Sequence, residues 1–224
     1  IRNYERRCHL SQKDHNHLKI EHHYLEVPKG EYIYFEAYNH NKVYFVQEGY
    51  IRIGYIDAEG NEIVKEIIQK GELFGQFTLE RNNLHGEFAQ AYKQDVSLCA
   101  FHIEDFEKLL KSRPDLALRY SKQVGAKLRN IENRLLNLLN KDVKTRLIHF
   151  FWQLVEQKLG ENMPEGFCIP NYLKHEDIAN LIGSSRQTVT TMINELETEG
   201  ILSYNRQQIC FLNVKKLQKL VTVN

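Results

Sequence analysis

Hydrogen-bonding side chains gather in one short segment near the C-terminus. From Lys174 to Leu196 the chain reads KHEDIANLIGSSRQTVTTMINEL. Arginine can contact guanine through two hydrogen bonds and glutamine can do the same with adenine, while hydroxyl groups and helix N-termini suit phosphates. The segment supplies these groups, none of them acidic: Ser185, Arg186, Gln187, Thr190, Thr191 and Asn194. This chemistry predicts recognition of double-stranded DNA in the major groove.

The same segment predicts two short helices that cross at a tight turn. Ala179 is small where the helices would pass over each other, and Gly183 supplies the turn, where a Cβ would cost energy. Ser184 and Gln187 have the spacing of a capping box for the second helix. The apolar residues would form the buried contacts: Ile178, Ile182, Val189, Met192, Ile193 and Leu196. We expect a helix-turn-helix, rather than a helical hairpin with a polar face.

A β-hairpin is expected directly after these helices, with strands over 201–204 and 208–212. Arg206 at its tip would meet a phosphate or the minor groove, although an ordinary solvated loop arginine is an equal alternative. Acidic and basic residues nearly balance from Lys141 onward, so affinity for DNA should depend on a few placed cations. These are Lys174, Arg186 and Arg206.

The sequence gives little support for enzyme activity or for a zinc site. The sequence contains no P-loop and no G-x-S-x-G motif. His175-Glu176 does not begin an H-E-x-x-H motif, because Ala179 stands where the second histidine would be. We therefore expect no enzyme activity. The widely spaced cysteines argue against a zinc site and predict separate, reduced thiols in a cytosolic protein: Cys8, Cys99, Cys168 and Cys210.

An N-terminal group of histidines leaves two alternatives open. Metal or haem binding is one, and solvated polar residues on a leader segment are the favoured one. The group comprises His9, His15, His17, His22 and His23.

Composition sets wide limits. The chain has 224 residues, 42% of them hydrophobic, which allows a packed core in each of two domains. Lys+Arg number 30 against 29 Asp+Glu, so net charge neither indicates nor excludes a nucleic acid. No apolar run approaches the roughly 20 residues that span a bilayer, and no secretory signal pattern opens the chain. We expect no membrane contact and a cytoplasmic location. Because the chain begins at Ile1, a preceding segment is expected.

Short strands separated by glycines are predicted between Leu25 and Phe101. Residues 31–35, 43–46, 51–56, 63–68 and 97–101 are rich in β-branched and aromatic residues, and 57–61 form a good hairpin loop. This pattern indicates an antiparallel sandwich or roll.

A long helix is predicted from Pro114, after a short helix over 102–111. Its apolar residues recur at alternating spacings of four and three, which is a heptad seam: Val124, Leu128, Ile131, Leu135 and Leu138. The seam could pack within its own domain, but its length favours a two-stranded coiled coil between two copies. Another apolar-periodic helix is predicted over 145–159.

The chain resembles the Crp/Fnr family, relatives of the catabolite activator protein, over nearly its whole length. Residues 178–189, IANLIGSSRQTV, are similar to the family signature I-x-x-x-x-G-x-S-R-E-T-V. The segments 27–30, 43–49 and 71–75 resemble the family's β-roll. The resemblance implies a roll of the cyclic-nucleotide-binding type, a long dimerisation helix, a winged helix-turn-helix, and contact with RNA polymerase.

The resemblance assigns DNA-reading roles with some departures. Arg186 matches the family's guanine-reading arginine, whereas Gln187 replaces a glutamate and Thr191 a second arginine of the activator protein, so base preference should differ. Lys174 replaces the Thr or Ser that caps the first helix.

The effector pocket departs further. Gly75-Gln76 stands at the family's ribose-binding Gly-Glu pair, and Gly86-Glu87 stands at its phosphate-binding Arg-Ser pair unless the alignment shifts toward Arg81. Ile131-Glu132 replaces the Thr-Ser that meets adenine. A glutamate would repel a cyclic phosphate, so we expect no binding of cyclic AMP in the usual way, and the effector stays unknown.

The predicted architecture is α+β. A β-roll effector domain (1–113) precedes a dimerisation helix (114–140) and a winged helix-turn-helix (141–224). The predicted function is a homodimeric, sequence-specific transcription regulator that reads a two-fold symmetric DNA site. The alternative is a cyclic-nucleotide or other small-ligand signalling module that does not use its helix-turn-helix on DNA.

Overall fold

A computed structural model gives the architecture of the chain and describes residues 22–35, 41–75, 87–159, 164 and 166–223. It separates into two compact units, Ile1–Arg129 and Asn130–Asn224. The long helix α3 (Pro114–Asn140) contributes residues to both units and begins at the predicted proline. None of the described helices is long and apolar enough to cross a membrane.

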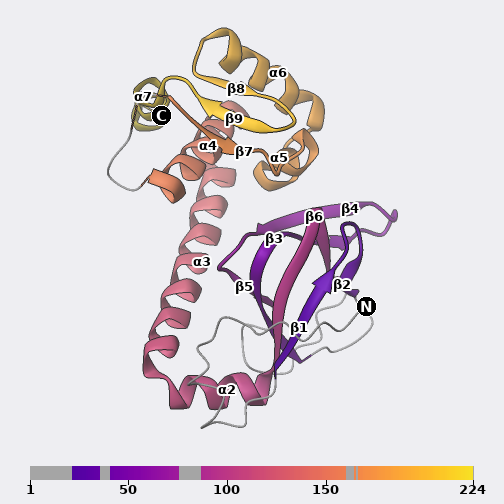
Figure 1. Ribbon diagram of the computed structural model, residues 1–224. Coiled ribbons are helices and arrows are strands. Elements are labelled where there is room, and N and C mark those ends of the chain that lie inside the picture. Colours follow the sequence, from indigo (N-terminus) through magenta and orange to yellow (C-terminus); the bar gives the residue numbers. More distant parts are fainter. Residues whose placement is uncertain (1–21, 36–40, 76–86, 160–163, 165, 224) are drawn as a thin grey trace. The chain divides into compact units, whose positions relative to one another are not determined.

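The first unit is an antiparallel β-roll, drawn in indigo to magenta in Figure 1. Two long strands, β3 (Lys42–Ile56) and β6 (Glu87–His102), pair with each other along most of their length. Four shorter strands extend the sheet at its edges: β1 (His22–Val27) and β2 (Tyr32–Phe35) pair with β6, and β4 (Glu62–Ile68) and β5 (Leu73–Gly75) pair with β3. The α-helix α2 (Ile103–Ser112) follows β6 directly.

The strand β3 corrects one expectation. Gly49 read as a break between strands over 43–46 and 51–56, but the structure has one continuous strand with a register shift on each side of Glu48. Gly49 has a φ of +94°, and a Cβ there would lie 2.8 Å from the carbonyl oxygen of Asp95. The glycine therefore allows a bulge that bends the pair of strands without ending it. The strand expected over 97–101 is likewise only the end of β6.

Apolar side chains fill the roll. Inward-facing residues of β3 and β6 alternate with exposed ones and meet Phe74, which is fully buried. A second cluster joins the outer side of the sheet to α2, through Val43, Cys99, Phe101, Phe106 and Leu109.

The second unit is a winged helix. After the end of α3, the helices α4 (Val143–Leu159), α5 (His175–Ile182) and α6 (Arg186–Thr198) pack around a core that includes Phe151, Ile178 and Leu196. A three-stranded sheet has the order β7 (Phe167–Pro170), β9 (Gln208–Phe211) and β8 (Leu202–Tyr204). The C-terminal helix α7 spans Val214–Val223. The strands β8 and β9 confirm the expected hairpin, whereas β7 and α7 were not predicted.

The cysteines correct another expectation. Cys168 on β7 and Cys210 on β9 form a disulfide, and Cys99 is also disulfide-bonded, so the prediction of separate reduced thiols is wrong for these three residues. Cys168 and Cys210 are 42 positions apart in the sequence, so nothing in their spacing indicates that they are opposite each other in one sheet. Only the unpredicted strand β7 brings them together.

Gly183 and Gly200 offer a matched test of the turn between α5 and α6. Both have a φ of +66°, but a Cβ on Gly183 would lie 2.7 Å from Leu138 Cδ2, while nothing lies within 4 Å at Gly200. Gly200→Ala should lower the free energy of unfolding by about 1 kcal/mol through left-handed strain alone. Gly183→Ala should lower it by about 1–2 kcal/mol, because the end of the Leu138 side chain must also shift aside.

Urea unfolding followed by the fluorescence of Trp152 measures both losses. Trp152 is the single tryptophan, and its side chain is buried in α4 of the second unit. Equal losses in the two variants would show that the close approach to Leu138 carries no energy.

Candidate nucleic-acid interface

The turn between α5 and α6 is held by backbone and side-chain bonds. Gly183 adopts the left-handed conformation at the end of α5, and the N–H of Ser184 donates to the carbonyl of Ala179 at 2.9 Å. Arg146 on α4 donates to the carbonyl of Gly183, and Arg134 at the end of α3 donates to the carbonyl of Asn180, each at 3.0 Å. The last two turns of α3 and the start of α4 therefore fix the crossing of the helix pair.

The second helix begins one residue later than the capping-box prediction. Ser185 is the N-cap residue, and its hydroxyl oxygen accepts the N–H of Thr188 at 3.1 Å. The predicted box of Ser184 and Gln187 is wrong, because Ser184 still belongs to the turn. The shift leaves Gln187 in the first turn of α6 with an exposed side chain.

The first helix is capped from inside. Lys174 cannot accept a hydrogen bond through its ammonium group, but the carboxylate of Asp177 accepts the N–H of Lys174 at 2.7 Å. Asp177 is buried, which its negative charge tolerates because it lies at the positive end of the α5 dipole. This reverse cap replaces the missing Thr or Ser, and Lys174 keeps an exposed side chain.

The outer face of α6 carries the predicted contact residues. Ser185, Arg186, Gln187 and Thr191 are exposed, whereas Thr190 is partly buried. The predicted apolar face is buried as expected except for Met192, which is partly exposed.

Thr190 forms internal hydrogen bonds that sequence reasoning missed. Its hydroxyl donates to the carbonyl of Arg186 at 2.9 Å, and His175 Nδ1 lies 2.8 Å from the same oxygen. Since the single hydroxyl proton points to Arg186, His175 Nδ1 must be the donor. Burial and the nearby Arg186 guanidinium lower the pKa of His175 below its usual value. A neutral His175 therefore ties the start of α5 to α6 at pH 7.

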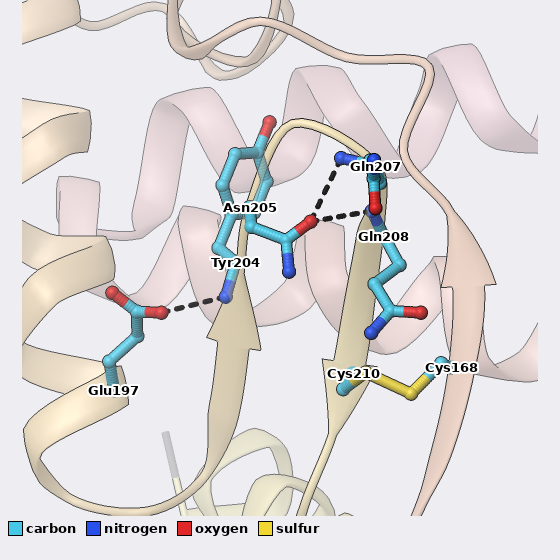
Figure 2. Close-up of a disulfide and its surroundings, with 7 residues drawn as sticks. All are labelled: Cys168, Glu197, Tyr204, Asn205, Gln207, Gln208 and Cys210. Carbon is cyan, nitrogen blue, oxygen red and sulfur yellow. Dashed lines mark hydrogen bonds between the residues drawn. A yellow bond between two sulfur atoms is a disulfide. The ribbon is translucent and has the colours of Figure 1, made fainter.

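The wing is attached to α6 and to β7, as Figure 2 shows in part. The carboxylate of Glu197 on α6 accepts the N–H of Tyr204 at 2.7 Å. At the tip, the side-chain oxygen of Asn205 accepts the N–H groups of Gln207 and Gln208 at 2.8 and 2.9 Å. Arg206 lies within this turn and is exposed. Glutamate and asparagine carry no sequence motif here, so their roles could be found only from the structure.

Aromatic rings pack together near Glu87, one of the predicted pocket residues. Tyr44 stacks on Phe74 with ring centroids 4.8 Å apart, and Tyr34 lies 5.9 Å from Tyr44. Tyr34 donates its hydroxyl to Glu87 at 2.6 Å, and Lys65 forms an ion pair with the same carboxylate. Burial, followed by the charge of Glu87, raises the pKa of Tyr34 well above its usual value. Glu87 is thus held in place at the start of β6.

The structure describes only some of the other predicted pocket residues. Gly75 has a φ of +96°, and a Cβ there would lie 2.5 Å from the carbonyl oxygen of Lys42, so only glycine fits. Gln76 and Gly86 lie outside the described residues. Ile131 and Glu132 are exposed residues of α3 in the second unit.

The heptad seam of α3 is exposed to solvent in the single chain. The fractional exposure of its residues ranges from 36% at Val124 to 57% at Ile131. Large apolar side chains at this level of exposure call for a partner surface. Leu128, Leu135 and Leu138 complete the seam.

Metal binding finds no site among the described residues. They contain no group of three histidine, cysteine, aspartate or glutamate side chains that could hold a metal ion. His9, His15 and His17 fall outside the described ranges, while His22 and His23 belong to β1.

Known protein families match both units. Residues 24–113 match the cyclic nucleotide-binding domain, and residues 145–220 match the Crp-like helix-turn-helix domain. The global nitrogen regulator of Synechocystis sp. (strain ATCC 27184 / PCC 6803 / Kazusa) is 27% identical over 195 residues, which cover 87% of this chain and 86% of that protein.

Solved structures agree with these matches. A CooA mutant from Carboxydothermus hydrogenoformans has a TM-score of 0.73 and 25% identity, covering 89% of this chain and 88% of that one. A CRP/FNR-family transcriptional regulator from Thermus thermophilus has a TM-score of 0.65 and 28% identity, covering 89% of this chain and 98% of that one. With its roll, its helix-turn-helix and these relatives, the chain belongs to the Crp/Fnr family of DNA-binding transcription regulators.

Proposed function

We propose that the chain acts as a homodimer that reads a two-fold symmetric DNA site with its α6 helices. The observation that carries this proposal is the exposed polar face at the start of α6, held rigidly by α3, α4 and α5. Two such helices must lie about 34 Å apart to enter successive major grooves. The dimer works in the cytoplasm and catalyses no reaction; contact with RNA polymerase stays a prediction from the family resemblance.

Each predicted residue has a role in this proposal. Arg186 reads guanine and Gln187 reads adenine, because both are exposed in the first turn of α6. Ser185, Thr190 and Thr191 line the helix start, where hydroxyl groups and backbone N–H groups face the phosphates. Thr190 acts mainly by fixing α6 to His175. Lys174 at the start of α5 and Arg206 at the tip of the wing supply phosphate contacts.

Dimerisation uses the heptad seam of α3. Val124, Leu128, Ile131, Leu135 and Leu138 would pack against the same residues of a second copy, which removes their apolar surface from water. The proposed organisation is a roll over 1–113, this dimerisation helix over 114–140 and the winged helix over 141–224.

The roll senses an effector other than cyclic AMP. Tyr34 and Lys65 hold the carboxylate of Glu87 at the place where the family resemblance puts a phosphate-binding pair. The family resemblance also assigns Gly75, Gln76, Gly86, Ile131 and Glu132 to effector binding. A signal there would change the packing of the α3 helices and so the spacing of the two α6 helices.

Replacing Arg186 tests base reading. Arg186→Ala should weaken binding to the cognate duplex by about 1–3 kcal/mol and relax the preference at one base pair. Fluorescence anisotropy with the cognate duplex and its single-base variants measures both effects. Lys219→Ala is the matched control, since it removes an exposed cation from α7. An equal loss on every sequence would make Arg186 a phosphate contact instead.

Charges in the heptad seam test dimerisation. The double variant Leu128→Glu/Leu135→Glu should sediment as a monomer and bind the two-fold site about 100-fold more weakly, because only one half-site contact remains. Leu212→Glu is the control: Leu128, Leu135 and Leu212 are 56%, 55% and 50% exposed, but Leu212 lies outside α3. A double variant that remains a dimer would refute this interface.

Titration with cyclic AMP tests the pocket. Millimolar cyclic AMP should leave DNA affinity unchanged and should give no binding heat in calorimetry, because the carboxylate of Glu87 repels the phosphate. Glu87→Gln keeps an acceptor for Tyr34 but removes the charge, so any residual affinity should rise in this variant. Saturation of the unaltered protein at micromolar cyclic AMP would contradict the proposal.

A further inference from the structure

The disulfide of the second unit lies on the outer face of the wing sheet. The N–H of Asn171 donates to the carbonyl of Gln207 at 2.8 Å, and hydrogen-bonded pairs alternate along an antiparallel ladder. Cys168 and Cys210 are therefore opposite each other at a non-hydrogen-bonded position, where side chains approach most closely. Figure 2 shows their bond crossing from β7 to β9.

The sheet does not depend on this bond for its core packing. The rings of Phe167 and Phe211 stack with centroids 5.2 Å apart, and the Ile169–Ile209 pair is buried. These pairs face the opposite side from the cysteines, since side chains alternate along a strand. Opening the disulfide would leave the strands packed on the helices.

The bond does restrain the tip of the wing. Asn171, three residues after Cys168, donates its N–H to the carbonyl of Gln207 and its side-chain amide to the carbonyl of Asn205 at 2.6 Å. These two carbonyls flank Arg206, the proposed phosphate contact. The disulfide fixes β7 to β9 immediately before this point, so it limits how far the tip can move.

The setting of the pair favours a reversible bond. A regulator of transcription works where thiols are kept reduced, and disulfides found there are usually transient or redox-sensing. The side chain of Cys168 is exposed, so a reductant can reach its sulfur. We propose that Cys168 and Cys210 form a reversible thiol–disulfide site that sets the hold of the wing on DNA, an inference that rests on the proposed role of the wing.

The exchange balances as a two-electron reaction with a small dithiol. One thiolate of the dithiol attacks Cys168 Sγ, which breaks the bond to Cys210 and releases Cys210 as a thiolate. The second thiol of the reductant then closes its own disulfide and releases Cys168. The two freed thiolates take up two protons, and the dithiol is oxidised.

The test compares the full chain after treatment with oxidised glutathione and with dithiothreitol. Alkylation and mass spectrometry report the state of each cysteine, anisotropy reports affinity for the cognate duplex, and hydrogen exchange reports residues 203–209. The reduced protein should bind about three- to tenfold more weakly, as expected for loosening one phosphate contact. Exchange at 203–209 should also be faster in the reduced state.

Variants separate this site from the remaining cysteines. Cys168→Ser/Cys210→Ser should behave as reduced under both treatments, while Cys8→Ser should keep the response; Trp152 fluorescence checks that each variant is folded. Failure of the bond to form under oxidant, a redox response that persists in the double variant, or equal exchange at 203–209 in both states would overturn the inference. If no duplex binds in either state, the proposed function of the wing fails, and hydrogen exchange still decides whether the disulfide restrains it.

Discussion

The crossing of α5 and α6 at Gly183 is the constraint on which the DNA-reading surface depends. A left-handed residue there brings the two helices together, and a Cβ at this position would also displace the end of the Leu138 side chain. Every group on the outer face of α6 takes its direction from this turn. A change of a few degrees in the crossing would move the side chain of Arg186 by a distance that matters to a bidentate contact.

The last turns of α3 are part of the same constraint. Leu138 packs against the turn, and Arg134 donates to the carbonyl of Asn180 at its entrance. Leu138 therefore belongs both to the proposed dimer seam and to the contacts that hold the helix-turn-helix, and Arg134 lies next to Leu135 of the seam. A signal that rotates or shifts α3 must act on both sets together, so dimer packing and the direction of α6 are mechanically linked within the second unit. This linkage requires no contact between the roll and the winged helix.

The sequence reveals the helix-turn-helix more completely than the roll for a physical reason. Its signals are local: a glycine turn, a small residue and apolar residues at helical spacing lie within 174–196. The roll and the wing sheet depend on pairs distant in the chain. The strand β7 could not be found because it is only four residues long and because Pro164, Gly166 and Pro170, in or near it, disfavour a strand. Gly49 was expected to separate two strands but lies in a bulge of one strand, because glycine is common both in bulges and in turns.

The residues of the candidate site also differ in whether local sequence signals could predict them. Arg186 and Gln187 were predictable because exposure at a helix start follows from periodicity, whereas the bonds that support them were not. Asp177, His175 and Glu197 act on backbone groups or hydroxyls that lie near them only after folding. Glu87 is an intermediate case: its negative charge is evident from the sequence, but its contacts with Tyr34 and Lys65 form only when β2 pairs with β6 and β4 pairs with β3. A carboxylate held by two partners cannot swing away from an incoming anion. The proposed exclusion of cyclic phosphates would depend on this fixed position of the carboxylate.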